Sequence, residues 1–291
     1  MSAHIDHTTE TELHTPDGTR LFIRDWPLPD DAVWRKEGVV IMHGLGEHCG
    51  RYAHVARFFN ALGFTVRTYD MRGHGKSSGS SGNVPDDEAM LRDAELVIKD
   101  FSVDLACAPI LFGHSMGGLF AARFALAETA PLRALILSSP ALALHMSGVQ
   151  RGLLRIASLL CPSLGLANGL NTRYLSHDAE VIYAYRNDPL VHPRISARLL
   201  NAMISAIAYT QQKAATLHLP TLLLAAVDDH LVDPEGSRRF AAAAGNAYLS
   251  THFYAGFYHE IFNELDPTPV FDDLRTWLEV QQISPLMQPE A

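Results

Sequence analysis

The sequence predicts an α/β protein in which helices cover both faces of a mostly parallel central sheet, with a helical cap inserted into the chain. Two observations support this prediction. Short apolar runs rich in β-branched residues alternate with longer helical patterns, as in proteins whose parallel strands are joined by helices. The alternation stops between Pro140 and His218, where helical sequence rich in Leu and Ala intervenes before the next strand.

Six apolar runs account for the predicted strands, and helical patterns lie between them. The strands are expected at residues 38–44, 64–70, 109–115, 132–140, 219–229 and 247–256. The helices are expected at residues 51–62, 86–106, 116–128, 235–244 and 268–282. Upstream, the segments TELHT and RLFIRDW flank a turn at residues 16–18 and indicate an antiparallel hairpin at the edge of the sheet.

The interruption divides the chain into a core, residues 1–140 and 219–291, and a cap, residues 141–218. Within the cap, residues 152–170 carry a single charge, on Arg155. Such a segment is too apolar for a fully solvated surface. Two interpretations stay open: a helix packed on the core, or an apolar lip over a lipid-like substrate, which would also contact a membrane surface transiently.

The composition indicates a globular protein and excludes one class of partner. Hydrophobic residues make up 47% of the chain and charged residues 19%, which is typical of globular domains. The 23 Lys and Arg residues are outnumbered by 32 Asp and Glu residues, and the formal net charge is −9. Binding nucleic acid needs basic residues that neutralise phosphates, so no nucleic-acid partner is expected.

The cysteines and the apolar segments of the sequence indicate in which cellular compartment the protein is expected. Cys49, Cys107 and Cys161 are odd in number and widely spaced, which favours neither a disulfide framework nor a zinc site. The first fifteen residues lack the basic and apolar regions of a signal peptide. The most apolar long window, residues 108–127, contains His114 and is better explained as a buried strand followed by a helix than as a membrane span. We therefore expect a cytoplasmic protein, peripheral to the membrane where it contacts one.

Two serines match the pattern G-x-S-x-G, which marks a nucleophilic serine on a sharp turn between a strand and a helix. Ser115 has the apolar run PILF before it and the helical pattern MGGLFAARFALA after it. Ser77 lies in a loop rich in Gly and Ser that has neither neighbour. Because the turn requires both a strand and a helix, Ser115 is the candidate nucleophile.

The residues around Ser115 suit such a turn. A sharp strand-to-helix turn forces the serine into an unfavourable backbone conformation and needs small neighbours, which Gly113, Gly117 and Gly118 supply. The turn places the hydroxyl at the positive end of a helix. There the backbone N–H of Met116 could donate to an oxyanion that develops on the substrate.

A serine hydroxyl needs a base to take its proton and an acid to orient that base. In this architecture the acid follows the nucleophile in sequence and stands just after a later strand. Asp229 is preferred because the apolar run ends at Val227 and a tight turn follows. Asp228 is the close alternative, while Asp233, which precedes Pro234, is better explained as the start of the next helix.

His259 is the candidate base because it alone follows both the acid and the last predicted strand. His230 is adjacent to the acid, and His252 lies within the strand. A zinc site has little support, because the segment HEIFN that begins at His259 lacks the second His of the H-E-x-x-H motif. We expect no metal and no cofactor.

One N–H group holds an oxyanion poorly, so a second donor is expected after an earlier strand. The run VVIMHGLGEHCGRY turns at His43 and Gly44, which lets the backbone N–H of Leu45 face the Ser115 hydroxyl. An ordinary loop between a strand and a helix would explain the glycines of this run. It would not explain why the run occurs in a chain that also carries a candidate nucleophile, acid and base.

Six blocks, HGLGEHCGRY, YDMRGHGKSSG, FGHSMGG, NDPLV, VDDHLVD and YAGFYHE, occur in this order over residues 38–262. In them the chain resembles the monoacylglycerol lipase and lysophospholipase group of α/β-hydrolases, which is also classed with the serine aminopeptidases. The resemblance implies the α/β-hydrolase fold, a triad of Ser115, Asp229 and His259, oxyanion donors at Leu45 and Met116, and a cap over an acyl channel. For the block YDMRGHGKSSG the resemblance implies that the polar residues stabilise the loop and take no part in catalysis.

The expected activity is hydrolysis of a small-molecule acyl ester, of monoacylglycerol or lysophospholipid type, through an acyl-enzyme. Two activities on the same fold stay open, an imino- or aminopeptidase and a short-chain carboxylesterase. The peptidase would need an acid in the cap to bind a free amine, for which Asp178, Glu180 and Asp188 are available. A silent binding protein of this fold usually lacks a triad residue, whereas all three are present here.

Overall fold

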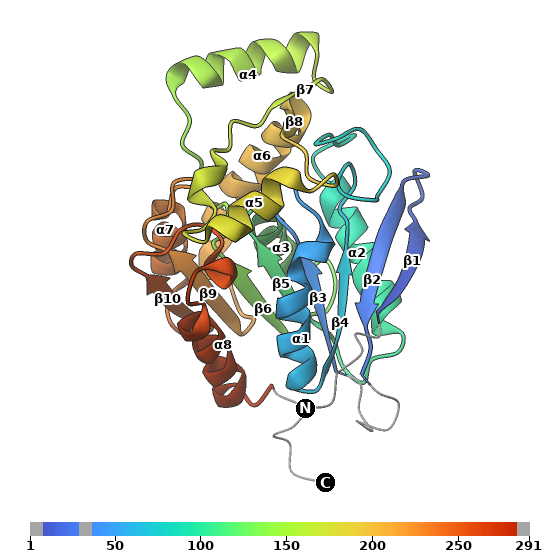
Figure 1. Ribbon diagram of the computed structural model, residues 1–291, viewed down its shortest axis with the longest axis vertical. Coiled ribbons are helices and arrows are strands. Elements are labelled where there is room, and N and C mark those ends of the chain that lie inside the picture. Colours follow the sequence, from blue (N-terminus) through green and yellow to red (C-terminus); the bar gives the residue numbers. More distant parts are fainter. Residues whose placement is uncertain (1–7, 29–36, 284–291) are drawn as a thin grey trace.

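The computed structural model describes residues 8–28 and 37–283 (Figure 1). Residues 1–7, 29–36 and 284–291, which belong to the predicted core, lie outside this part. Within the described residues the central sheet has eight strands in the order β1-β2-β4-β3-β5-β6-β9-β10. They are β1 (Thr9–His14), β2 (Arg20–Trp26), β3 (Glu37–Met42), β4 (Phe64–Tyr69), β5 (Ile110–His114), β6 (Ala134–Ser138), β9 (Thr221–Ala226) and β10 (Leu249–Tyr254).

The pairing of these strands confirms the predicted α/β class. Strands β4, β3, β5, β6, β9 and β10 are parallel, whereas β1 pairs with β2 and β2 with β4 in the antiparallel sense. All six predicted strands and the edge hairpin are present. The strands are shorter than predicted because the apolar runs continue into the loops that follow them.

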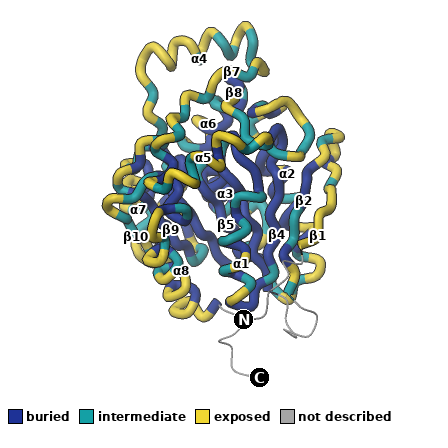
Figure 2. Tube along the Cα trace, viewed as in Figure 1, coloured by how far each residue is buried: buried dark blue, intermediate teal, exposed yellow. Residues whose placement is uncertain are grey.

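Helices cover both faces of the sheet (Figure 1). On one face lie α1 (Ala53–Ala61) and α8 (Thr268–Val280); on the other lie α2 (Ala89–Ser102), α3 (Met116–Leu126), α6 (Ala197–Lys213) and α7 (Glu235–Ala244). Strand β3 shows why: Val39 and Ile41 pack in the first layer and Val40 and Met42 in the second. Because side chains alternate along a strand, a wholly apolar strand needs cover on both faces. Figure 2 shows the central strands of the sheet as buried, whereas the edge strand β1 is largely exposed.

The inserted segment is less uniformly helical than predicted. It contains α4 (Gly148–Leu160), α5 (Ala179–Asn187) and two short strands, β7 (Gly165–Ala167) and β8 (Arg194–Ser196), which pair in the antiparallel sense. The short 3-10 helices within residues 8–28 and 37–283 are η1 (Cys49–Tyr52), η2 (Thr172–Tyr174), η3 (Ala214–Thr216) and η4 (Ile261–Asn263). Strands of three residues are too short to give a periodic signal, so the sequence could not predict β7 and β8.

Helices α4 and α6 both lie within residues 141–218, but they are buried to different degrees. The face of α6 that carries Leu199, Ala202 and Met203 is buried in the core layer beside α3. None of the residues of α4 is buried, and the helix stands apart from the sheet (Figure 1). The interpretation of this apolar segment as a helix packed on the core is therefore wrong for α4. None of the described helices has the length and apolar character needed to cross a membrane.

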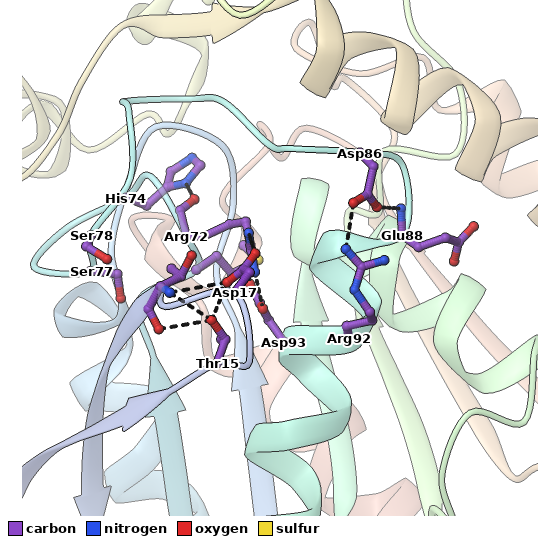
Figure 3. A network of polar contacts seen from close by, with 12 residues as sticks. Thr15, Asp17, Arg72, His74, Ser77, Ser78, Asp86, Glu88, Arg92 and Asp93 are labelled. Atoms are coloured by element: carbon purple, nitrogen blue, oxygen red, sulfur yellow. Dashed lines mark hydrogen bonds and ion pairs between the residues drawn. The ribbon is translucent and has the colours of Figure 1, made fainter.

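The loop between β4 and α2 forms a polar scaffold, as the resemblance implied (Figure 3). The guanidinium of Arg72 donates to both carboxylate oxygens of Asp93, at 2.5 and 2.6 Å, and to Asp17 at 2.8 Å. His74 Nδ1 lies 3.0 Å from the carbonyl oxygen of Arg72. The hydroxyl of Ser77 donates to the Asp70 carbonyl and accepts from the Phe22 N–H. Ser77 therefore has a structural role in this loop.

Ser115 lies at the turn between β5 and α3 with φ 54° and ψ −117°. This positive φ confirms the predicted unfavourable conformation. A Cβ at Gly117 would lie 2.3 Å from the carbonyl oxygen of Met42 and 2.5 Å from that of His43. A Cβ at Gly113 would lie 2.5 Å from the Gly117 carbonyl oxygen. The glycines therefore allow α3 to start directly against the ends of β3 and β5.

We predict that Gly117→Ala lowers the free energy of unfolding by about 1–3 kcal/mol, because the added methyl group must push backbone atoms apart. Urea unfolding measures this change as a lower midpoint at constant slope. The matched control is Gly152→Ala on α4, where the new Cβ would meet no described atom within 4 Å. It should leave stability unchanged or raise it by up to about 1 kcal/mol. Equal losses in the two variants would contradict the close-approach argument.

Candidate functional site

A pocket of about 540 Å³ lies between the carboxyl ends of the parallel strands and the inserted segment. The core contributes Leu45, Ser115, Met116 and His259 to its walls. The inserted segment contributes mostly apolar side chains: Leu153, Leu154, Ala157, Leu170, Leu200 and Met203. Ligands bind α/β sheets at this edge, outside the carboxyl ends of the strands.

The backbone of Ser115 is held on both sides of the turn. Its N–H donates to the Ser138 carbonyl oxygen at 3.0 Å, and its carbonyl oxygen accepts from Leu119 N and Ala141 N, each at 3.0 Å. These bonds tie the strained residue to α3 and to the end of β6, which keeps its side chain at the pocket wall. Because Met116 is the first residue of α3, its N–H has no partner within the helix and adds to the positive potential there.

The structure brings His259 and Asp229 together. His259 Nδ1 lies 2.6 Å from Asp229 Oδ2, and both side chains are buried. The other carboxylate oxygen, Oδ1, accepts from Leu231 N at 2.8 Å and Val232 N at 3.0 Å. Three hydrogen bonds therefore hold the acid with one oxygen turned toward the imidazole ring.

The alternative acids and bases make other contacts than the pair of His259 and Asp229. Asp228 is exposed and accepts from Gly256 N at 2.6 Å, and Asp233 accepts from Glu235 N at the start of α7. His230 lines the pocket, but its ring packs at a tilt against that of Tyr174, with centroids 4.3 Å apart. His252 pairs with Asp273 at 3.0 Å. None of these contacts brings an alternative residue to His259.

The pKa values at this pair follow from burial and charge. Burial opposes the imidazolium form of His259, but the charge and hydrogen bond of Asp229, with weaker help from Glu260 and Glu47, raise its pKa above the ordinary value. Burial would raise the pKa of Asp229, yet His259 and the two N–H donors lower it. The carboxylate therefore stays ionised and favours a protonated His259.

A second histidine, His114, which was not among the predicted site residues, lies beside the site. The ring of His114 lies 4.9 Å from that of His259 between centroids, and its Nδ1 is 3.0 Å from Ser138 Oγ. Burial first, and then the charge of His259, lowers the pKa of His114 to about 4, so its ring is neutral at pH 7. Its place directly before the serine of the turn was the signal that could have identified it.

The loop after β3 also lies close to Ser115. A Cβ at Gly44 would lie 3.4 Å from Ser115 Cβ, and the N–H of Gly44 donates to Glu47 Oε1 at 2.6 Å. Leu45, which follows, lines the pocket with Ser115. Glu47 and Arg51 follow Leu45 in the chain, and Glu260 directly follows His259. These three residues were not predicted as part of the site, although their positions in the blocks HGLGEHCGRY and YAGFYHE could have indicated it. Among the described residues no cluster of three His, Cys, Asp or Glu side chains could hold a metal ion.

Comparison with known proteins agrees with this architecture. Residues 35–266 match the family model described as serine aminopeptidase, S33. The monoacylglycerol lipase of Mycolicibacterium smegmatis is 34% identical over 90% of this chain and 93% of its own length. The monoglyceride lipase of Rattus norvegicus is 28% identical over 91% of this chain and 89% of its own length.

Solved structures are similar along most of the chain. The monoacylglycerol lipase of Paleococcus ferrophilus superposes with a TM-score of 0.80 at 32% identity, covering 89% of this chain and 98% of that one. A monoglyceride lipase variant from Saccharomyces cerevisiae has a TM-score of 0.83 at 22% identity, covering 96% and 98% of the two chains, and supports the fold alone.

The fold and the site define the class of protein: it is a serine hydrolase with the α/β-hydrolase fold. Within that class the chain belongs to the serine aminopeptidase S33 family, whose model covers most of its length.

We predict that Asp229→Asn lowers kcat about 10⁴-fold, because the amide favours the wrong imidazole tautomer. His259 accepts a proton only when neutral, so activity falls as the pH drops through its raised pKa. Without the Asp229 charge that pKa falls, and the acid limb of kcat/KM moves to lower pH. Ester hydrolysis across pH measures both effects.

The matched control for this prediction is Asp228→Asn, which removes the neighbouring exposed carboxylate. It should leave kcat and the acid limb as in the original protein. Loss of activity in Asp228→Asn, with Asp229→Asn active, would show that the acid has been assigned to the wrong residue.

Proposed function

We propose that this chain hydrolyses carboxylic esters of monoacylglycerol or lysophospholipid type, with Ser115 as nucleophile, His259 as base and Asp229 as orienting acid. One observation carries the proposal: a serine on a strained turn shares a pocket with a buried histidine whose Nδ1 is hydrogen-bonded to a carboxylate. Relatives whose names describe monoacylglycerol and monoglyceride lipases support this substrate class.

The proposed reaction has two acyl-transfer steps. His259 takes the Ser115 proton while Oγ attacks the ester carbonyl carbon, and the electron pair of the C=O bond moves onto oxygen. The N–H groups of Leu45 and Met116 donate to this oxyanion, where one such donor is worth about 3 kcal/mol. The alcohol leaves with the proton from His259. A water molecule, deprotonated by His259, then attacks the acyl-enzyme and releases the acid.

The apolar lining of the pocket supports a medium or long acyl chain. Leucine and methionine side chains from α4 and α6 form its upper wall, while the ends of the strands form its floor. Burying apolar surface contributes about 0.8 kcal/mol for each methylene group. A medium or long acyl chain therefore gains more from this pocket than a short one, which disfavours the short-chain carboxylesterase alternative.

The charges of the pocket support a neutral head group over a phosphorylated one. Among the described residues that line it, Glu47 and Glu260 are the acidic side chains, and none is Lys or Arg. Arg51 holds the pKa values of both carboxylic acids below their ordinary range. A phosphate would therefore meet negative charge and no basic lining residue, so glycerol esters are the favoured class within this proposal.

The peptidase alternative receives less support. Asp178 accepts from Glu180 N at the start of α5, and Asp188 pairs with His48 at 2.8 Å. Neither these two acids nor Glu180 is among the described residues that line the pocket. A cap acid that could bind a free amine is therefore not available among the three candidates.

We also propose that residues 141–218 act as a cap that contacts membrane surfaces transiently. Helix α4 exposes Val149, Leu153, Ile156, Leu159 and Leu160, with Leu159 84% exposed. Arg151 and Arg155 lie on the same helix and would favour an anionic surface.

The unpaired Cys49, Cys107 and Cys161 agree with a reducing compartment, and we propose that the protein acts in the cytoplasm, peripheral to the membrane.

A panel of oleoyl esters tests the proposal. We predict that monooleoylglycerol is hydrolysed with a kcat/KM on the order of tenfold above that of an oleoyl lysophospholipid with a net negative head group, since repulsion between two like charges within a few ångströms costs about 1 kcal/mol or more. Ser115→Ala is the matched control and should hydrolyse neither ester. Faster turnover of the lysophospholipid would overturn the head-group assignment, and full activity of Ser115→Ala would overturn the mechanism.

A further inference from the structure

Three charged side chains link the two loops that flank Ser115. Arg51, on η1, donates to both carboxylate oxygens of Glu260, each at 2.7 Å, and also to Glu47 Oε2. The side chains of Glu47 and Glu260 are each 4% exposed and that of Arg51 is 12% exposed, and the guanidinium lies over the Tyr185 ring, 4.8 Å from its centroid. The two ends of this bridge are 213 residues apart in sequence, so it joins loops that share no local structure.

One end of the bridge fixes the loop after β3. Glu47 Oε1 accepts from Gly44 N and from the Tyr52 hydroxyl, each at 2.6 Å. Gly44 directly precedes Leu45, whose N–H is the proposed oxyanion donor. The position of that N–H therefore depends on where the Glu47 carboxylate is held.

The other end fixes the loop that carries the proposed base. Glu260 directly follows His259, and its N–H donates to the Leu175 carbonyl oxygen at 2.8 Å. Its carboxylate also accepts from Asn263 Nδ2 at 2.9 Å. Because the carboxylate and the N–H of Glu260 are both hydrogen-bonded, His259, the preceding residue, has little freedom to rotate away from Ser115.

We propose that Glu47, Arg51 and Glu260 form a positioning bridge that holds the Leu45 N–H and the His259 ring at a fixed separation across Ser115, and that its excess negative charge stabilises protonated His259. The inference rests on the proposed function, because it assigns the bridge a role in that reaction. None of its three residues is assigned a bond to the reacting atoms.

The charges around His259 support the electrostatic half of this proposal. One arginine faces two ionised glutamates, so the bridge carries one excess negative charge in a buried site. Asp229 is bonded to the ring, while His114, the other titratable group beside it, is neutral at pH 7. Glu260 and Glu47 act in the same direction as Asp229 and favour the imidazolium that forms as Ser115 attacks.

A bridge kept for stability alone is the competing explanation. Buried ion pairs are costly to desolvate, and apolar replacements are often as stable. The chain offers a matched comparison, since Arg72 and Asp93 form another buried bidentate pair, in the scaffold loop away from the pocket (Figure 3). Loss of that pair should change stability without changing the chemistry.

The test compares Glu260→Gln and Arg51→Lys with Asp93→Asn and Arg72→Lys. Monooleoylglycerol hydrolysis is measured across pH for each protein, per mole of folded enzyme, together with the thermal midpoint. Glu260→Gln should lower kcat/KM about ten- to hundredfold and move its acid limb to lower pH. Arg51→Lys, which keeps the charge but cannot bridge both carboxylates, should lower kcat and leave the limb in place. The control variants should lose stability only.

Two results would overturn the inference: an acid limb in Glu260→Gln that matches the original protein, or losses of kcat in both bridge variants no larger than those of the controls. If a variant does not fold, Glu47→Gln provides the same charge test at the other end of the bridge. Full activity of Ser115→Ala would instead overturn the proposed function, so the two failures are distinguishable.

Discussion

The close approach of α3 to the ends of β3 and β5 determines where every other part of the site can lie. Gly117 packs against the carbonyl oxygens of Met42 and His43, which leaves no room for a side chain. The turn that achieves this holds Ser115 at positive φ, a conformation that costs about 1–3 kcal/mol for a residue other than glycine. Hydrogen bonds to β6 and α3 retain that strain, and the serine side chain is presented to the pocket as a result.

Buried charge is the second constraint. Near the serine, the chain buries Asp229, His259, Glu47, Arg51 and Glu260 instead of apolar residues. Burial alone would neutralise the acids, but each has an ionic partner and N–H or hydroxyl donors that keep it ionised. The apolar cap residues on the other side of the pocket provide no such partners. The charged side chains of the pocket therefore lie near Ser115, and its apolar side chains lie under α4.

Much of the fold was predictable because its signals are local. Parallel strands buried on both faces appear as continuous apolar runs, and the turn at Ser115 has its glycines within three residues. Chain order and the ends of the apolar runs pointed to His259 and Asp229, although Asp228 stayed a close alternative until the contact of His259 with Asp229 was seen. The short strands β7 and β8, the burial of α6 beside α3, and the bridge from Arg51 to Glu260 depend on contacts between distant segments, for which the sequence carries no periodic signal.

The central claim, that Ser115 attacks while the N–H groups of Leu45 and Met116 hold the oxyanion, is tested most directly by a crystal structure after reaction with an alkyl fluorophosphonate. In that reaction Ser115 Oγ bonds to phosphorus and fluoride leaves. We predict phosphorus on Ser115 Oγ, with one phosphonyl oxygen about 2.7–3.1 Å from both backbone nitrogen atoms. Phosphorus on another residue, or a phosphonyl oxygen turned away from these nitrogens, would contradict it.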